Sequence, residues 1–271
     1  MSNITIVTAF FDIGRGQWTP DKGYPHYLHR TNETYLERFS YLAQLKNPMV
    51  IFTTVDMIEP LKKLRNGIQT YFFPLELKIF NDYRDKIAQI QSDPDYQNMI
   101  HPSQRMNPEY WNPDYVLVNF LKTKFVNLAI QSNMVHTELV AWLDFGYCRS
   151  ADKVPPSKKW SYDFNPNKMH LFNYKDFQPG DNINRIIATN DVYILGAKIV
   201  GGKKVWNDFG FLMNSAFNKL YDNGLMDDDQ TLLLLATLFA PDLFELHRIP
   251  DHQLGLDPFV ILKDYNNEYD I

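Results

Sequence analysis

Short apolar runs alternate with helical patterns along the first 74 residues. Each run is apolar at both odd and even positions, which is typical of strands buried on both faces of a sheet. The segments between the runs have the spacing of amphipathic helices. Because strands and helices alternate, the pattern predicts parallel strands joined by right-handed crossovers. The predicted strands are 4–11, 48–54 and 70–74, and the predicted helices are 31–39 and 59–66.

The rest of the chain has a less regular pattern. Residues 75–113 are polar and contain four prolines, which indicates an insertion and not a separate domain. Gly201 and Gly202 indicate a turn. We expect one α/β domain over 1–271, with a mostly parallel, Rossmann-like sheet in 1–150 and a mixed α+β half in 151–271. Further helices are predicted at 115–132, 205–223 and 227–238, and further strands at 138–143, 170–172 and 192–196.

Composition excludes several classes of protein. The 271 residues are 45% apolar and 22% charged, which excludes disorder over most of the chain. The net charge of −5 argues against nucleic acid as a partner. There is one cysteine, no apolar run long enough to span a membrane, and no basic segment before the first strand. These features predict a cytoplasmic protein without a signal peptide.

Polar residues follow the first and fourth predicted strands, where open α/β sheets bind ligands. Asp12 and Arg15 follow the first strand; a carboxylate accepts hydrogen bonds from a base or ribose, and a guanidinium binds phosphate oxygens. A surface ion pair explains the same two residues. Asp144 and Gly146 follow the fourth strand, in the run WLDFG. This carboxylate either holds Mg²⁺ or Mn²⁺ with a diphosphate, or opens a turn before the glycine.

Two charged groups lie on predicted helices. The triplet Asp227-Asp228-Asp229 begins one helix, so one aspartate is a cap by default, while mutual repulsion makes another a candidate base or ligand. A solvated acidic helix start is the simpler interpretation. Lys122 and Lys124 lie on the helix before the fourth strand. A lysine facing the sheet edge would neutralise a diphosphate, whereas one facing solvent would only add charge. No dinucleotide, P-loop, zinc-protease or serine-hydrolase motif is present.

Taken in order, these segments resemble the bacterial HtrL/YibB family. The resemblance runs from about residue 4 to residue 246. Proteins of this family look like nucleotide-diphospho-sugar transferases of the GT-A group and are associated with lipopolysaccharide or capsule synthesis. The resemblance implies a GT-A-like fold and the transfer of a hexose from a UDP-linked donor to a glycan or glycolipid acceptor, with at most peripheral contact with the inner membrane. It is carried by TAFFDIGR, TKF, SNMVHTELVAWLDFGYCR, ILGAKIVGG, DDDQTLLLLA and PDLFEL.

The resemblance also implies roles for individual residues. Asp144 stands where the family has an acidic strand-end residue, the counterpart of a DxD metal site for Mn²⁺ or Mg²⁺, although here the motif has one carboxylate. In an inverting enzyme, Asp228 or Asp229 would activate the acceptor hydroxyl; the sequence does not decide between inversion and retention. Lys124 would meet the diphosphate. The residues implied to bind the nucleotide sugar are Thr8, Phe10, Asp12, Arg15, Lys124, Asp144 and Gly146.

Two other functions remain open at this point. One is a glycan-binding or assembly protein that has a transferase-like fold without turnover, since a fold does not determine a function. The single carboxylate of WLDFG is the feature that favours it. The other is a nucleotidyltransferase, which shares the sheet architecture and acidic metal sites and would release pyrophosphate.

Overall fold

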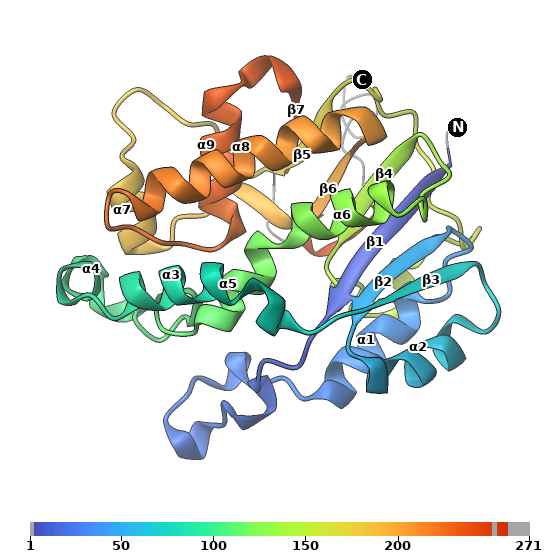
Figure 1. Cartoon of the computed structure of the whole chain (residues 1–271), viewed down its shortest axis with the longest axis horizontal. Coiled ribbons are helices and arrows are strands. Elements are labelled where there is room, and N and C mark those ends of the chain that lie inside the picture. The colour runs from blue at the N-terminus through green and yellow to red at the C-terminus, as the bar shows by residue number, and fades with distance from the viewer. Residues whose placement is uncertain (1–2, 251–253, 260–271) are drawn as a thin grey trace.

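The computed structural model, which describes residues 3–250 and 254–259, is built on a sheet of seven strands (Figure 1). The strand order is β3-β2-β1-β4-β6-β5-β7. The first four strands are parallel, β6 is antiparallel to both of its neighbours, and β5 is parallel to β7. The expected α/β class with a mostly parallel sheet is therefore confirmed. The strands are β1 Ile4–Phe10, β2 Met49–Thr53, β3 Thr70–Pro74, β4 Leu139–Leu143, β5 Met169–Asn173, β6 Ile194–Gly202 and β7 Phe244–Arg248.

Helices cover both faces of the sheet, because the central strands are apolar on both faces (Figure 1). On β1, Val7 and Ala9 belong to the core shared with α6, α8 and α9, whereas Ile6 and Phe10 belong to the core shared with α1 and α2. The helices are α1 Asn32–Leu42, α2 Ile58–Arg65, α3 Asn81–Gln91, α4 Pro94–Met99, α5 Pro113–Phe120, α6 Lys122–Gln131, α7 Ile183–Thr189, α8 Lys203–Tyr221 and α9 Asp229–Phe239.

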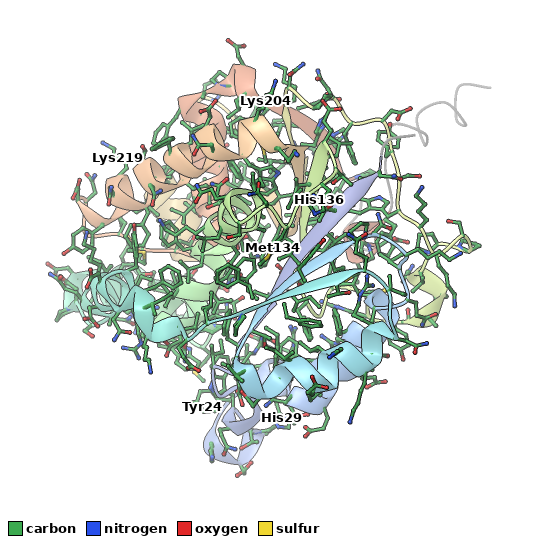
Figure 2. All side chains as sticks on the ribbon, turned by 45° about the vertical axis from the view of Figure 1, so that its right-hand side comes forward. Tyr24, His29, Met134, His136, Lys204 and Lys219 are labelled. Carbon is green, nitrogen blue, oxygen red and sulfur yellow. The ribbon has the colours of Figure 1, made fainter. Side chains whose placement is uncertain are left out.

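Helix α8 shows how these layers form. Its buried face carries Trp206 and Phe209, which are both fully buried, while Lys204 and Lys219 are exposed on the opposite side (Figure 2). This distribution is the amphipathic pattern that predicted the helix. Among the described residues, no helix is both long and apolar enough to cross a membrane.

Two predictions about local structure are wrong. The helix expected over 115–132 is divided at Leu121 into α5 and α6, so the first turn of α6 begins at Lys122. Gly201 and Gly202 do not form a turn; they are the last two residues of β6 and pair with β4. A Cβ on Gly202 would lie 2.1 Å from the carbonyl oxygen of Pro166, so the glycine permits a close approach between two backbones.

The segment 75–113 packs into the body of the protein. It contains α3 and α4, and three of its tyrosines, Tyr83 among them, donate hydrogen bonds to the second half of the chain. The Tyr96 hydroxyl donates to the carbonyl of Met226 at 2.7 Å, and the Tyr110 hydroxyl donates to the carbonyl of Ile187 at 2.6 Å. The segment therefore brings its buried Glu109 next to residues that are distant in sequence.

Candidate functional site

A cavity of about 230 Å³ lies at the carboxyl ends of β1 and β4. The two strands are parallel neighbours, so the segments that follow them meet at one edge of the sheet. The structure thus brings together a large part of the expected nucleotide-sugar site. The residues of that site that line the cavity are Phe10, Asp12, Arg15, Asp144 and Gly146.

Lys122 lies at the centre of the buried charges beside this cavity. Its side chain is 4% exposed, and its ammonium lies 2.9 Å from Oδ1 of Asp144 and 2.8 Å from Oδ2 of Asp229. It also donates a hydrogen bond to the carbonyl of Gly196 at 3.1 Å. Although burial disfavours a charged ammonium, the two carboxylates raise the pKa of Lys122 above its ordinary value. The lysine is therefore a fixed cation that joins β4, β6 and α9.

Asp144 is the part of this cluster that reaches the cavity. Its side chain is 38% exposed, compared with 3% for Asp229. Oδ1 of Asp144 accepts hydrogen bonds from Lys122 and, at 2.7 Å, from Nε1 of Trp142. Both donors bind the same oxygen, so the orientation of the carboxylate is fixed from behind while the group remains accessible.

The loop after β1 is organised by its own polar side chains. Oδ1 of Asp12 accepts from the backbone N–H of Gly14 at 2.8 Å, and Oδ2 accepts from Nδ2 of Asn32 at 2.9 Å. Gly14 has a φ of 81°, a left-handed conformation that favours glycine. Arg15 is 8% exposed and donates to the carbonyl of Leu28 through both Nε and Nη2. These contacts hold Asp12 and Arg15 at the cavity wall.

Aromatic rings form the apolar wall of the cavity. The ring of Phe145 stacks on that of Phe39 at 4.3 Å and on that of Phe10 at 4.8 Å. Tyr35 lies against Gly146, where an added Cβ would lie 3.0 Å from the tyrosine ring, and its hydroxyl accepts a hydrogen bond from Arg15 at 3.0 Å. Flat rings beside polar groups suit a sugar or a base.

Two residues of the expected site lie elsewhere. The ammonium of Lys124 donates to the Tyr83 hydroxyl at 3.2 Å and to Oδ1 of Asn214 at 3.1 Å, in a separate hollow between α6 and α8. The lysine at the cavity is Lys122, two residues earlier, because positions i and i+2 point to opposite sides of a helix. Thr8 is fully buried within β1 and does not line the cavity.

The three aspartates of the acidic triplet lie in different environments. Asp228 caps α9 by accepting a hydrogen bond from the N–H of Gln230 at 3.0 Å, as the default interpretation expects, and it is half-buried. Asp227 accepts from the Thr231 hydroxyl at 2.6 Å. Burial raises the pKa of Asp228 well above its ordinary value, and the charges of Asp227 and Asp229 raise it further. Neither Asp228 nor Asp229 lines the cavity, so their expected catalytic role stays a prediction.

Sequence reasoning missed a fourth carboxylate beside the triplet. Glu109 is 4% exposed, and its Oε1 accepts a hydrogen bond from Nδ2 of Asn190 at 2.7 Å. Burial raises the pKa of Glu109 to about 8, and the charge of Asp228 adds to the effect. No local signal marks this residue, because it meets the triplet only through the packing of the segment 75–113.

The described residues do not complete a divalent-cation site at Asp144. One of its oxygens already binds the ammonium of Lys122, and the other carboxylate at the cavity, Asp12, binds Gly14 and Asn32. A magnesium or manganese ion needs several oxygen ligands and is repelled by an adjacent ammonium. Within residues 3–250 and 254–259, Asp144 belongs to no group of three side chains that could hold a metal.

The described residues contain one such group, on β5 and β7. The ligand atoms of His170, Glu245 and His247 lie within 4.8 Å of one another. Nδ1 of His170 and Nε2 of His247 are 3.0 Å apart, which is a hydrogen bond between the two rings. Burial and the neighbouring His170 lower the pKa of His247 to about 4. His247 is therefore a buried core histidine whose ring is hydrogen-bonded to that of His170.

Comparison with known proteins gives the relatives of the chain. Residues 2–255 match a family described as "Bacterial protein of unknown function (HtrL_YibB)". Protein HtrL of Escherichia coli strain K12 is 40% identical over 250 residues, which cover 91% of this chain and 88% of that protein. The crystal structure of mouse xyloside xylosyltransferase 1 in its apo form aligns with a TM-score of 0.39 and 9% identity, over 96% of this chain and 94% of that chain. By sequence, the chain belongs to the HtrL/YibB family.

Proposed function

We propose that this protein is a glycosyltransferase that moves a hexose from a nucleotide-diphosphate donor, with UDP as the nucleotide, to a surface-glycan acceptor. The observation that carries the proposal is the convergence at one cavity of the residues that follow β1 and β4. In open α/β sheets this edge is where nucleotides bind. The aromatic wall supplies a surface for a base or sugar, and the charged side chains supply contacts for phosphate and hydroxyl groups.

In this proposal Asp144 acts on the sugar. Transfer breaks the bond between the anomeric carbon and the donor phosphate, whose oxygen keeps the electron pair, and the anomeric carbon becomes oxocarbenium-like. A carboxylate held in position by Lys122 and Trp142 stabilises that positive charge without reorganising. Lys122 in turn keeps Asp144 and Asp229 from repelling each other.

The acceptor hydroxyl forms the new bond to the anomeric carbon and must lose its proton. Asp228 does not line the cavity, but it is the member of the triplet that is not fully buried, so it is the candidate to receive the proton from an acceptor that reaches it there. Its raised pKa makes it a stronger base than an exposed aspartate. Asp229 has an internal ion pair with Lys122 and serves as a positioning residue.

Nucleotide binding is the first test. UDP, GDP and CMP are compared by thermal shift with and without Mn²⁺, because a ligand that binds only the native state raises the unfolding temperature. UDP should give the largest shift. If none of the three nucleotides binds with or without the metal, the proposal is wrong. The Mn²⁺ arm tests the metal that the family resemblance implies.

The second test separates transfer from binding. Asp144→Asn keeps the size of the side chain and should retain the fold and UDP binding, while sugar transfer or donor hydrolysis falls by about 100-fold or more. Asp242→Asn, an aspartate outside the cavity, is the matched control. Full activity of Asp144→Asn would remove the assigned role.

A glycan-binding protein without turnover is the second candidate function. The observation that favours it is that both carboxylates at the cavity, Asp12 and Asp144, are already engaged with protein groups. Glycan binding with neither transfer nor hydrolysis of any nucleotide sugar would support this alternative.

A further inference from the structure

Three arginines gather on the α1 side of the cavity. Arg30 lies two residues before the start of α1, Arg38 is within α1, and Arg149 follows β4. Arg30 and Arg149 line the cavity. Arg38 does not line the cavity but lies directly beside it, because its Cδ lies 3.6 Å from the position that a Cβ would take on the cavity residue Gly146. Three guanidinium groups therefore converge in a protein whose net charge is −5.

The positive charges of these arginines are not compensated within the described part of the chain. No carboxylate there forms an ion pair with Arg30, Arg38 or Arg149. Nη1 of Arg38 is buried and has no hydrogen-bond partner. A buried donor without an acceptor is costly, so the unpartnered nitrogen of Arg38, close behind the cavity residue Gly146, favours an anion in this part of the protein.

The electrostatics of the cluster agree with its geometry. Burial lowers the pKa of Arg38, and the positive charges of Arg30 and Arg149 lower it further. Partial desolvation and the charge of Arg30 have the same effect on the pKa of Arg149, whose side chain is exposed. The groups are thus close enough to repel one another, and an anion bound between them would relieve that repulsion.

Arg15 differs from these three residues in one important respect. Its Nε and Nη2 donate to the carbonyl of Leu28, and its Nη1 donates to the hydroxyl of Tyr35. Three of its five N–H donors are therefore already engaged. Arg15 adds positive charge to the cavity wall, whereas Arg30, Arg38 and Arg149 form no ion pair with a carboxylate of the described residues.

We propose that Arg30, Arg38 and Arg149 form a phosphate-oxyanion site that holds the diphosphate of the donor. This inference rests on the proposed function and names the groups that receive the leaving group. Guanidinium groups bind phosphate oxygens through paired N–H donors and stabilise the charge that develops on the departing diphosphate. In this arrangement Asp144 acts on the sugar and the arginines act on the phosphates. A phosphate group on the acceptor has the same chemistry and is the other source of the anion.

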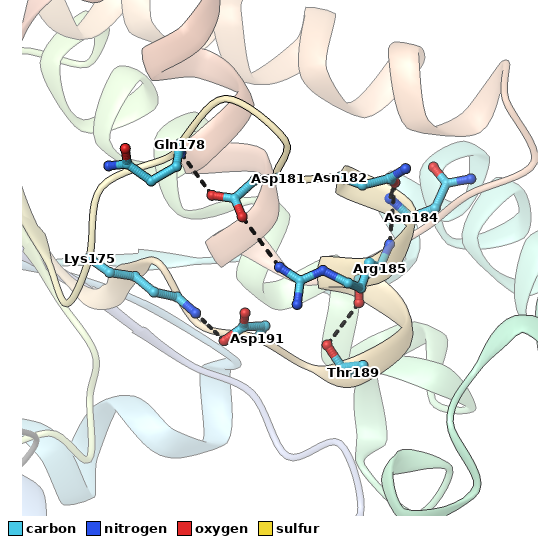
Figure 3. A network of polar contacts seen from close by, with 8 residues as sticks. All are labelled: Lys175, Gln178, Asp181, Asn182, Asn184, Arg185, Thr189 and Asp191. Carbon is cyan, nitrogen blue, oxygen red and sulfur yellow. Dashed lines mark hydrogen bonds and ion pairs between the residues drawn. The ribbon is translucent and has the colours of Figure 1, made fainter.

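The site is tested by calorimetric titration of inorganic pyrophosphate, UDP and uridine in the presence of EDTA. Arg30→Met and Arg149→Met each remove one guanidinium. The matched control is Arg185→Met, because Arg185 lies on α7 with a side chain that is 57% exposed and pairs with Asp181 at 3.3 Å (Figure 3). Each variant changes the net charge by the same amount.

We expect Arg30→Met and Arg149→Met each to weaken pyrophosphate and UDP binding by about tenfold, the effect of losing one charge-assisted hydrogen bond. Uridine binding should not change, and Arg185→Met should match the wild type. The wild type should also lose more pyrophosphate affinity on addition of salt than either cavity variant. Equal pyrophosphate affinity in all three variants and the wild type would overturn the site.

Two further measurements separate the outcomes. If the arginine variants bind anions normally and sugar transfer persists, the arginine site is wrong and the proposed function stands. Arginine-dependent pyrophosphate binding in a protein that transfers no sugar from any nucleotide donor overturns the proposed function alone. Glucose 6-phosphate, as a probe for a phosphorylated acceptor, is compared with UDP in competition against pyrophosphate. Stronger competition by UDP assigns the site to the donor, and the reverse assigns it to the acceptor; both results uphold the oxyanion site.

Discussion

The carboxylate of Asp229 lies directly against the backbone of Gly196. A Cβ built on Gly196 would be 2.3 Å from Oδ2 of Asp229, closer than real Cβ contacts allow. The carbonyl of the same glycine accepts a hydrogen bond from Lys122, which also pairs with Asp229. Because Gly196 has no side chain at this position of β6, the buried Lys122 and the buried Asp229 can meet there.

Gly196→Ala should disrupt this contact. The added methyl group must displace either Asp229 or β6, which we expect to lower the free energy of unfolding by about 1 to 3 kcal/mol, the usual cost of overpacking. Urea denaturation measures the change. Gly16→Ala is the control, because the nearest atom to its Cβ would be 3.7 Å away, an ordinary contact. Equal stability of the two variants would show that Asp229 has room to move.

Lys122→Met should destabilise the protein by about 3 to 5 kcal/mol, because it leaves the buried Asp229 carboxylate without a cation. Lys124→Met, two positions along the same helix, should cost much less, since that lysine contacts only neutral partners, Tyr83 and Asn214. The double variant Lys122→Met/Asp229→Leu removes both buried charges and should recover part of the loss. Chemical denaturation measures the free energy of unfolding of the three variants. Similar losses for Lys122→Met and Lys124→Met would contradict the prediction.

Gly146→Ala should weaken nucleotide binding with the fold retained. The new Cβ would lie 3.0 Å from the ring of Tyr35 and push it aside, and the Tyr35 hydroxyl would then lose its hydrogen bond from Arg15. We expect a cost of about 1 kcal/mol, roughly fivefold in Kd for UDP. Tyr35→Phe removes the same hydrogen bond without the steric change and should give a similar loss. Wild-type affinity for UDP in both variants would show that the hydrogen bond between Arg15 and Tyr35 does not contribute to nucleotide binding.

Stability should fall as the pH rises from about 5 to about 8. Burial and the charge of Asp228 raise the pKa of Glu109 to about 8, above that of the unfolded chain. The folded protein then binds more protons than the unfolded chain in this range, so the stabilisation is complete below the unfolded pKa and is lost as the pH passes through the folded one. Burial raises the pKa of Asp227 to about 7, which adds to the same trend.

Glu109→Gln removes one of these titrating groups and should flatten the fall in stability. The unfolding temperature, measured from pH 5 to pH 9, should decline less in this variant than in the wild type. Asp95→Asn, an exposed change in the same segment, is the control and should follow the wild-type curve. A variant curve parallel to that of the wild type would show that Glu109 does not titrate in this range.

The sequence by itself determined the parallel part of the sheet and the edge at which its strands end, whereas β7 and the second half of β6 were not predicted. Strands that are apolar at every position must be covered on both faces, which specifies helices on both sides of a parallel sheet. The residues that follow parallel strands then share one edge, so Asp12 and Asp144 could be assigned to a common site before their distance in space was known. These conclusions depend on local pattern and strand direction, both of which the chain encodes within short segments.

Only the tertiary structure decided which charged groups meet at that edge. Positions 122 and 124 differ by roughly 200° around a helix, so the two lysines point to opposite sides of it. The sequence does not say which of them faces the sheet. Packing against β6 and α9 buries Lys122 against Gly196 and Asp229. The burial of Glu109 likewise depends on how the segment 75–113 packs. Arg30 and Arg38 meet Arg149, which follows β4, only through long-range packing that no local pattern of residues records.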